Sequence, residues 1–587
     1  MKVEHGTFQK RTRRRTRILV LALAVWSLGI AARLFQLQVL EHGRWSAQLV
    51  VQNQRWIKIV PERGTIYDRW GQILAQSLPV KSVGYNPGVG EPLDEQMKNI
   101  LRLNPVLKLT DAEIERIERE LRDAPPFIYI KRKVDSEIIE KAKALGVGGI
   151  TFPDEKKRFY PQGQLASQVL GGVGIENKGL SGIELKFDEV LRGSDGEQIT
   201  LVDTKHRAYH IEVLQEPRSG GDIELTLDST IQYFAEAALK RAVADQKAAW
   251  GTVIVSVPAT GEILAMASAP DYDPNAFPPA DPEAMINRAI RHLYEPGSTF
   301  KIVTASAGLE NRRVSLTQSF DCRKGVIETA GGAIHDHETF GILAFPEVII
   351  KSSNVGAVQI GRQVGSALLY RTVKAFGFGE KTGIELPAEA PGTVRAPSDW
   401  SRRSLDSISI GYEISATALQ ILEAANVIAN RGIYVPPRII KSVAGAMERR
   451  AARGDEPARI ISEQVAQELA AILERVVVEG TGKAAAVAGF SAAGKTGTTQ
   501  IYDPGQKSYQ SSKHIGSFVG FVPAEKPALS IIVVLGDPKK DDYYGGLVAA
   551  PVFREIAVRS LRAKGLFPRP DVGRTIIAAN AGKGKRP

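Results

Sequence analysis

Hydrophobic positions near the N-terminus form one uninterrupted run. Residues 18–32 (ILVLALAVWSLGIAA) carry no charge, and the apolar character continues in a helical pattern to Leu40. Because a helix needs about 20 residues to cross a bilayer, we predict a transmembrane anchor over residues 18–40, with Arg33 snorkelling to the interface. A cleaved signal peptide is the alternative, since the strictly apolar part is no longer than a signal-peptide core. The continuation to Leu40 favours the uncleaved anchor.

Beyond the anchor, short alternating runs between turn residues predict a β-rich region. Stretches such as 64–75 (GTIYDRWGQILA) and 196–203 (GEQITLVD) have this pattern, and Gly and Pro residues separate them. One strongly charged helical segment is predicted over 111–123. The region offers few chemical groups that could converge. We therefore interpret residues 41–225 as an extended, non-catalytic scaffold.

After this scaffold, the pattern changes to alternating strands and helices. Residues 222–228 (DIELTLD) alternate as a strand, and Ser229 is a candidate N-cap for the helical periodicity that follows. Residues 250–268 (WGTVIVSVPATGEILAMAS) predict two strands around a Pro-Ala-Thr-Gly turn. The alternation continues to a final helix, which defines a second domain over 226–566. The polar, Gly-rich residues 567–587 predict a disordered tail.

The charge of the chain is concentrated at its start. The composition, 43% hydrophobic and 24% charged, is that of a globular protein, and the single cysteine, Cys322, excludes an intrachain disulfide framework. Residues 1–17 contribute seven basic side chains against one acid to the net charge of +11. Such an arm can bind nucleic acid, but before an anchor it sets topology. It predicts a cytoplasmic N-terminus, everything after residue 40 outside, and no nucleic-acid partner.

The most informative chemical signal is the segment 294–310 (YEPGSTFKIVTASAGLE). Pro296 and Gly297 predict a turn, and an almost wholly apolar helix begins at Ser298. Lys301 lies three positions further on, so it shares one face of the first turn with Ser298. A buried lysine loses its charge readily and can then act as the base that a serine nucleophile needs. Taken alone, the motif more often marks a capping serine beside a surface lysine.

Two further motifs follow this serine along the chain. KSSNVG offers a hydroxyl and an amide two positions apart, and AAGKTGTTQ offers an amine beside two hydroxyls. The residues concerned are Ser352, Asn354, Lys495, Thr496, Gly497 and Thr498. The order Ser-x-x-Lys, Ser-x-Asn, Lys-Thr-Gly is shared by penicillin-binding proteins and serine β-lactamases. Each motif is weak alone, whereas the three in this order are strong evidence.

On these motifs the chain resembles the class B penicillin-binding proteins, over nearly its whole length. Residues 63–75, 158–174 and 179–193 are similar to the pedestal of that family, and PATGEILAMASAPDYDPNAF and GTGKAAAVAGFSAAGKTGT to its catalytic domain. The pattern is closest to the division-specific (septal, FtsI-type) branch. The resemblance implies an α+β / α/β fold class: a transmembrane helix, a β-rich elongated pedestal of the dimerisation type, and a serine β-lactamase-like transpeptidase domain. In that domain helices flank an antiparallel sheet.

The resemblance also implies how the peptide bond is broken. Ser298 attacks the carbonyl between the two terminal D-alanines of a peptidoglycan stem peptide and becomes an acyl-enzyme. Lys301 is the base, or part of a relay. Ser352 passes a proton toward the leaving amine, while Asn354 holds the substrate amide and Lys301. An amine of a neighbouring stem then resolves the acyl-enzyme, and β-lactams trap the serine.

The third motif is implied to bind the substrate. Lys495 supplies positive charge, and the hydroxyls of Thr496 and Thr498 bind the substrate carboxylate. Backbone N–H groups of Ser298 and Thr498 form an oxyanion hole. Residues 495–499 are an edge strand to which the peptide adds.

The implied partners follow from the same resemblance. They are D-Ala-D-Ala stem peptides, β-lactams as inhibitors, a membrane glycosyltransferase of the FtsW/RodA type and other divisome proteins, contacted largely through the anchor. No cofactor and no metal are expected, and the catalytic domain lies outside the cytoplasmic (inner) membrane. A septal D,D-transpeptidase is the first interpretation. The alternatives are an elongation-specific transpeptidase, a hydrolase that uses the same serine, and a sensor that only acylates.

Three patterns suggest other chemistry. A second K-T-G over 381–383 lies among glycines and before a proline, as in a surface turn. Residues 489–496 (GFSAAGKT) satisfy the P-loop pattern, but poor helix formers follow them. His335 and His337, on either side of Asp336, could share a metal, but no third ligand stands at a suitable spacing. We assign none of the three a function. Cys322 is expected to be packed or to lie on a loop.

Overall fold

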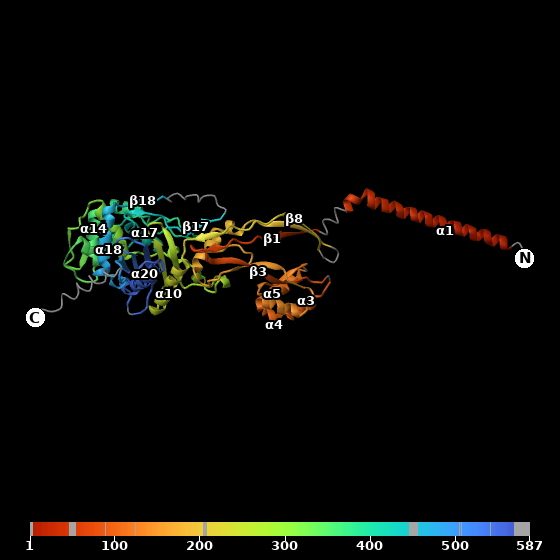
Figure 1. The fold of residues 1–587 in the computed structure, drawn as a ribbon, viewed down its shortest axis with the longest axis horizontal. Helices are drawn as coiled ribbons and strands as arrows, with labels where there is room; N and C mark the ends of the chain where they lie inside the picture. The colour runs from red at the N-terminus through yellow and green to blue at the C-terminus, as the bar shows by residue number, and fades with distance from the viewer. Residues whose placement is uncertain are drawn as a thin grey trace. The chain divides into compact units, whose positions relative to one another are not determined.

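The chain divides into two compact units. The computed structural model describes residues 4–45, 54–88, 90–123, 125–202, 208–444, 456–503, 505, 508–540 and 542–568 (Figure 1). The first unit comprises residues 1–62 and 193–219, and the second comprises residues 63–192 and 220–587. The predicted scaffold therefore contributes to both units. Most of the predicted tail, from residue 569 onward, lies outside the described residues.

One long helix dominates the start of the first unit. α1 runs over Glu4–Phe35 and continues as a π-helical turn over Gln36–Leu40. From Lys10 to Leu40 it is long and apolar enough to cross a membrane, and among the described residues no other helix is. The helix starts before the predicted anchor because the arm is also helical, as its many arginines allow.

The rest of the first unit is a three-stranded antiparallel sheet. Its strands are β1 (Gln54–Ile59), β7 (Gly196–Val202) and β8 (Ala208–Gln215), in the order β1-β7-β8. The central strand, β7, is the alternating segment GEQITLV that the sequence predicts. Residues 203–207, between β7 and β8, are outside the described part.

A larger sheet organises the N-terminal part of the second unit. Its strands are β2 (Ile66–Tyr67), β3 (Ile73–Tyr85), β4 (Ile128–Val134), β5 (Ile150–Thr151), β6 (Asp154–Phe159), β9 (Ile223–Leu225) and β17 (Ile440–Val443). Its helices are α3 (Leu93–Leu101), α4 (Asn104–Leu107), α5 (Asp111–Arg122) and α6 (Ser136–Ala144). The predicted charged helix is α5. A reciprocal capping box between Thr110 and Glu113 closes its first turn.

The C-terminal part of the second unit contains a five-stranded antiparallel sheet. Its order is β11 (Glu262–Ala269), β10 (Trp250–Val257), β21 (Leu529–Gly536), β20 (Ser508–Val522), β19 (Ala493–Asp503). The two strands predicted around the Pro-Ala-Thr-Gly turn are β10 and β11. β19, which carries the Lys-Thr-Gly motif, lies at the edge of the sheet, as the resemblance implies.

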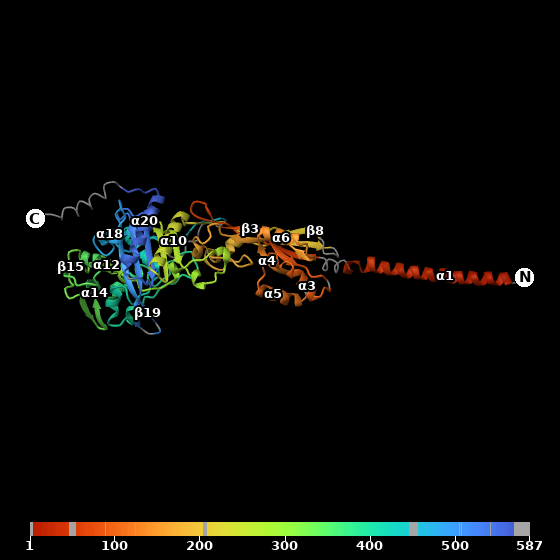
Figure 2. The ribbon, with the colours of Figure 1, turned by 90° about the horizontal axis from the view of Figure 1, so that it is seen from below.

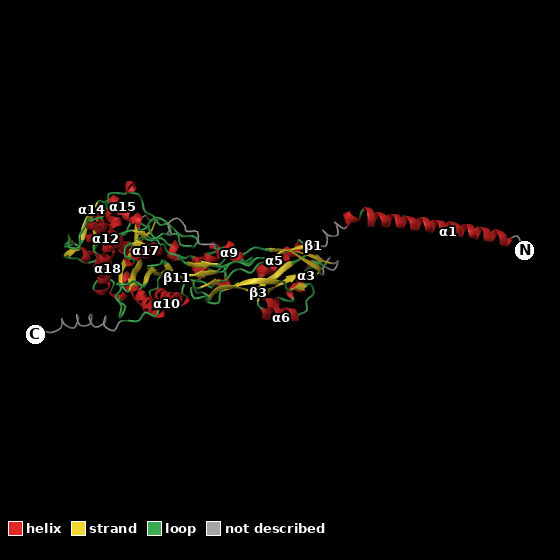
Figure 3. Ribbon diagram, turned by 45° about the horizontal axis from the view of Figure 1, so that its top comes forward, coloured by secondary structure: helices red, strands yellow, loops and turns green. Residues whose placement is uncertain are grey.

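Helices cover both faces of this sheet. α10 (Ser229–Asp245) and α20 (Ala550–Ala563) lie side by side on one face (Figures 1 and 2). α17 (Ala418–Ala429), with α12 (Lys301–Glu310) and α18 (Glu463–Val478), packs on the other (Figure 3). The predicted antiparallel sheet between two layers of helices is therefore present.

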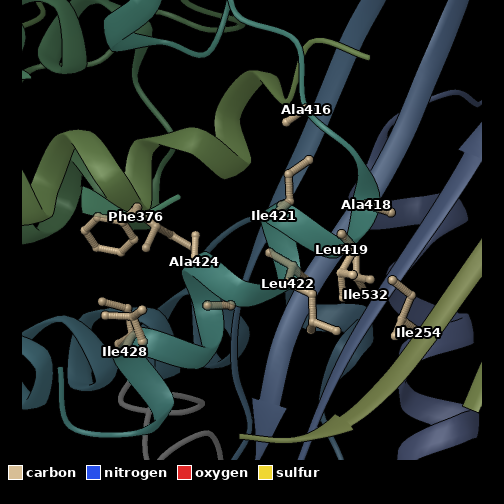
Figure 4. Packing of buried hydrophobic residues seen from close by; sticks show 14 of the residues in the cluster. Ile254, Phe376, Ala416, Ala418, Leu419, Ile421, Leu422, Ala424, Ile428 and Ile532 are labelled. Atoms are coloured by element: carbon tan, nitrogen blue, oxygen red, sulfur yellow. The ribbon is translucent and has the colours of Figure 1, made fainter. Parts of the chain in front are cut away.

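The side-chain alternation of β10 explains the two layers. Val253 and Val255 belong to the core on the α10 face, whereas Ile254 belongs to the core on the α17 face. Figure 4 shows Ile254 and Ile532 of the sheet facing Leu419 and Leu422 of α17. Because β10 is buried on both faces, its apolar residues stand at successive positions, as in Val253, Ile254 and Val255, and do not alternate with exposed ones.

One predicted cap is wrong. α10 begins after Asp228, whose Oδ1 accepts hydrogen bonds from the N–H groups of Thr230 and Ile231 at 3.0 and 3.1 Å. Ser229, the predicted cap, is the first helical residue, and its hydroxyl donates to Asp68 at 2.7 Å. The carboxylate of Asp228 caps the helix because the serine hydroxyl is engaged elsewhere.

The remaining elements connect these layers. The helices are α7 (Ser167–Leu170), α8 (Gly182–Lys186), α9 (Asp188–Arg192), α11 (Arg288–Arg291), α13 (Phe345–Ile350), α14 (Asn354–Val364), α15 (Ser366–Ala375), α16 (Ser404–Ser409) and α19 (Gly545–Val548). The strands are β12 (Ser319–Asp321), β13 (Val326–Thr329), β14 (Gly332–His335), β15 (Ile342–Ala344), β16 (Ile433–Tyr434) and β18 (Ala458–Arg459). Of these, β14, α13 and α14 position the site.

Candidate active site

The predicted nucleophile lies on a tight helical turn. Gly297–Phe300 form a 3₁₀ turn that leads directly into α12, so the α-helix begins at Lys301 rather than at Ser298. A 3₁₀ turn has three residues per turn, which places residues 298 and 301 directly on one face. Ser298 is half-buried and Lys301 is fully buried. The surface-lysine alternative is therefore wrong.

Lys301 is held by two oxygen acceptors. Its Nζ donates to the carbonyl O of Ser352 at 2.7 Å and to Oδ1 of Asn354 at 2.8 Å. Burial lowers the pKa of Lys301 to about 7, and the charge of Asp336 opposes that change. A neutral amine has two N–H donors and one lone pair. With both donors engaged, the lone pair is free to take a proton.

Ser352 lies between two amines. Its Oγ is 2.8 Å from Nζ of Lys495 and 3.5 Å from Nζ of Lys301. Since an amine donates to it, the hydroxyl can pass its own proton to a third group. Ser352 has φ +58°, a left-handed conformation that is uncommon for residues other than glycine and that recurs at functional sites.

Lys495 is a buried amine on the edge strand. It is completely buried, and its Nζ also lies 3.2 Å from the carbonyl O of Thr496. Burial holds the pKa of Lys495 well below its ordinary range, and neighbouring Lys301 lowers it further. A carboxylate bound beside it would reverse this effect, because an opposite charge favours the ammonium form.

Five of the eight predicted site residues line one cavity of about 450 Å³, and Lys301, Lys495 and Gly497 are not among its lining residues. Ser298, Ser352, Asn354, Thr496 and Thr498 line it, together with Thr481, Gln500, His514, Tyr543 and Tyr544. The structure therefore brings together side chains from all three motifs.

Hydroxyl groups form one wall of this cavity. Oγ1 of Thr496 lies 2.8 Å from Oγ1 of Thr481. Oγ1 of Thr498 accepts from the N–H of Gly545 at 3.1 Å, which leaves its own proton free to donate. The wall can therefore offer donors to an anion.

Glycines allow the backbone segments of the site to approach closely. Gly411 has φ +84°, and a Cβ there would lie 2.2 Å from the carbonyl O of Gly297. The N–H of Gly297 donates to the carbonyl O of Gly411 at 3.0 Å. At Gly497 a Cβ would lie 2.4 Å from Oγ of Ser517. The Gly in Lys-Thr-Gly is thus explained by close packing behind the edge strand.

Several residues of the site were not predicted from the sequence. Thr481 belongs to the GTGK segment but carries no motif of its own. The rings of His514 and Tyr543 stack at 3.8 Å and form another part of the wall. The sequence indicates for Asp336 only a place in a possible metal pattern or in a loop at the rim, although the structure shows it in contact with the Ser-x-Asn motif. An acidic residue alone in a loop gives no signal of such a contact.

The alternative motifs have structural explanations. Thr382 donates through its N–H and its hydroxyl to Glu389 at 2.7 and 2.6 Å, so the second K-T-G is a turn closed by that carboxylate. The formal P-loop runs into strand β19 and not into a helix, which removes the anion site it requires. Within the described residues, no group of three or more His, Cys, Asp or Glu side chains could hold a metal ion. Cys322 is buried, as expected.

Two family models match the chain. The penicillin binding protein transpeptidase domain matches residues 251–557, which contain all three motifs. The penicillin-binding protein dimerisation domain matches residues 58–225.

Individual relatives are similar over most of the chain. Stage V sporulation protein D of Bacillus subtilis is 33% identical over 517 residues, which cover 87% of this chain and 79% of that protein. Peptidoglycan D,D-transpeptidase FtsI of Escherichia coli is 30% identical over 565 residues, with coverage of 94% and 91%. Penicillin binding protein 3 from Mycobacterium tuberculosis, solved with aztreonam, has a TM-score of 0.66 and 28% identity over 88% of this chain and 98% of that one.

Proposed function

Because the chain belongs to the class B penicillin-binding proteins, we propose that it is a peptidoglycan D,D-transpeptidase that cross-links stem peptides through an acyl-enzyme on Ser298. The observation that carries the proposal is the position of Ser352, whose hydroxyl meets the amines of Lys495 and Lys301 at 2.8 and 3.5 Å on the cavity that Ser298 lines. The relatives named as D,D-transpeptidases support it. The proposed domains are an arm (1–17), an anchor (18–40), a dimerisation-type domain (41–225), a transpeptidase domain (226–566) and a tail (567–587).

In the proposed acylation, Oγ of Ser298 attacks the carbonyl carbon of the penultimate D-alanine. Its proton goes to the free lone pair of Lys301. Backbone N–H groups of Ser298 and Thr498 stabilise the oxyanion, and each such donor is worth about 3–4 kcal/mol in other acyl-transfer enzymes. Ser352 then gives a proton to the leaving nitrogen and regains one from a neighbouring lysine. The C–N bond breaks and D-alanine leaves.

The second half of the reaction reverses these proton movements. The amine of a neighbouring stem peptide attacks the ester carbonyl, and its proton goes to the same relay. The C–O bond to Ser298 breaks, and the serine oxygen recovers a proton from Lys301. The products are a new amide cross-link and the free enzyme.

The terminal carboxylate of the donor peptide would lie on the hydroxyl wall. Thr498 has a free O–H for it. The hydroxyl groups of Thr496 and Thr481, which are hydrogen-bonded to each other, lie on the same wall. Binding of this anion would favour the charged form of Lys495, so a positive charge appears when the substrate is in place. The peptide would add along the edge strand β19.

We further propose a septal role in the cytoplasmic membrane. The seven basic residues before the anchor favour a cytoplasmic N-terminus and an external catalytic domain. The partners would be a glycosyltransferase of the FtsW/RodA type and other divisome proteins. The relative named FtsI supports a role in division. The sporulation relative favours no particular site of wall synthesis in a dividing cell. A fluorescent fusion that marks the septum would support the septal role, and one that follows the side wall would favour elongation.

Labelling with a fluorescent penicillin tests the nucleophile. We expect the wild type to retain the label stably and Ser298→Ala to take up none. Ser306→Ala is a matched control, because this buried serine on α12 only donates to the carbonyl O of Ile302 at 2.8 Å. Rapid release of the label would favour a hydrolase, and labelling of Ser298→Ala would refute the nucleophile.

Product formation separates a transpeptidase from a sensor. Incubation with a lipid-linked donor and a partner polymerase should give cross-linked stem peptides that penicillin abolishes. Released D-alanine without cross-links would indicate a carboxypeptidase. Stable labelling with neither product would indicate a sensor.

A further inference from the structure

A carboxylate behind the site holds the start of α14. Asp336 directly follows β14, and its Oδ2 accepts a 2.8 Å hydrogen bond from the hydroxyl of Ser353. Its Oδ1 accepts from the backbone N–H of Asn354 and, at 3.1 Å, from that of Val355. These N–H groups are among those that a helix leaves without an internal partner. Asp336 therefore caps α14 from a different segment of the chain.

The residue beside this carboxylate orients the amide of Asn354. Its Nδ2 donates to the carbonyl O of His335 at 2.8 Å, so Oδ1 is the end that accepts from Lys301. A reversed amide would place one donor against another. The two residues 335 and 336 thus fix both the backbone and the side chain of Asn354.

The charge of Asp336 also raises the pKa of the proposed base, Lys301. It favours the ammonium form of Lys301 and so opposes the burial that lowers the pKa of this lysine to about 7. The other titratable groups around Lys301 are the amine of Lys495, the imidazole of His337 and the thiol of Cys322. Asp336 is the carboxylate of this set, so its removal takes away a charge that stabilises the ammonium form of Lys301.

We propose that Asp336 is a positioning residue of the acylation reaction, which holds Asn354 against Lys301 and provides a negative charge near the buried amine of Lys301. The inference rests on the proposed acylation of Ser298. The role of Asp336 is to set the geometry and the proton affinity of Lys301, while Ser298 and Lys301 carry out the chemistry.

The first test is Asp336→Asn, measured as the second-order rate constant for penicillin labelling over pH 5 to 9. We expect acylation at least about tenfold slower than in the wild type at neutral pH. We also expect the acidic limb of the profile to move to lower pH, because the ammonium form of Lys301 loses its stabilising neighbour. The matched control is Asp228→Asn, which removes a carboxylate cap from α10 but does not touch the cavity. Its profile should coincide with that of the wild type.

A second variant separates position from charge. Ser353→Ala removes the 2.8 Å contact with Oδ2, together with the acceptor for the N–H of Gly356, and keeps the carboxylate. It should slow acylation and leave the acidic limb where it is in the wild type. If Ser353→Ala acylates as fast as the wild type, the positioning role is refuted, even where Asp336→Asn fails to fold.

Two results with Asp336→Asn would overturn the inference. One is a rate within twofold of the wild type across the pH range. The other is a slower rate with an unmoved acidic limb, which would make the carboxylate a purely structural cap. Failure of the proposed function itself is distinct, because the wild type would then not be labelled, or Ser298→Ala would be.

Discussion

The amine of Lys495 donates a 2.8 Å hydrogen bond to the hydroxyl of Ser352, across 143 positions of the chain. The lysine lies on the edge strand β19, and the serine lies in the loop after α13. The bond therefore joins the sheet to the helical layer at the floor of the cavity. Because Lys495 is completely buried, its amine depends on such protein partners for its hydrogen bonds.

Loss of Lys495 should therefore disable acylation. We expect Lys495→Ala to lower the rate constant for penicillin labelling by about 100-fold or more, the size of effect that follows loss of a preorganised donor. The matched control is Lys381→Ala in the second K-T-G, an exposed lysine that does not line the cavity. It should label at the wild-type rate, and equal losses in the two variants would contradict our assignment.

The pH dependence of acylation should follow the protonation of Lys301. Burial lowers its pKa to about 7, and only the neutral amine can accept the serine proton. The rate constant should rise with pH through about 7 and level off above it. Below that region it should fall about tenfold per pH unit.

The measurement is the initial rate of penicillin labelling in buffers from pH 5 to 9, with stability checked at each pH. A flat profile, or one that is still rising steeply at pH 9, would exclude a lysine with a lowered pKa as the base. Lys301→Arg provides the control, because a guanidinium stays protonated over this range and should be inactive throughout.

The local pattern of the sequence predicted several elements of the fold. The anchor, the charged helix α5 and the strands β10 and β11 follow from apolar runs and turn residues that act over short distances. The order of the three motifs then allowed their convergence to be predicted, although they lie almost two hundred positions apart. The edge position of β19 came from the family resemblance and not from its own sequence.

Contacts between distant segments could not be predicted in the same way. Ser229 and Asp228 are both good caps, and the choice between them depends on Asp68, which lies 161 positions from Ser229. The bond between Asp336 and Ser353 joins a strand end to a helix start. The left-handed conformation of Ser352 is imposed by its surroundings, since serine has no preference for it.

A buried glutamate on α17 should make stability depend on pH. Glu423 is 1% exposed, and only its Oε1 is bonded, to Nδ2 of Asn426 at 3.1 Å. Burial raises the pKa of Glu423 from 4.5 to about 8. Between these values the unfolded chain has lost the proton that the folded protein keeps, so stability falls as pH rises from about 4.5 to about 8.

Glu423→Gln should remove this dependence. The neutral amide has the same shape and does not ionise, so the variant should gain Tm relative to the wild type as pH rises from 6 to 8.5. Each pH unit within the window corresponds to about 1.4 kcal/mol at most. The exposed Glu463 on α18 provides the control, since Glu463→Gln should shift Tm little at either pH. A difference between wild type and Glu423→Gln that is the same at both pH values would refute the argument.

The contact between Gly411 and Gly297 should be essential for the position of the nucleophile. Gly411→Ala would introduce a Cβ 2.2 Å from the carbonyl O of Gly297, and this backbone cannot move without displacing Ser298. We expect penicillin labelling to fall at least about tenfold, together with a lower Tm. Gly377→Ala separates this effect from backbone strain, because Gly377 has a similar φ of +85° but no atom within 4 Å of the added Cβ. It should lose only about 1–2 kcal/mol of stability and label normally. Equal labelling by the two variants would mean that Ser298 tolerates displacement of the residue before it.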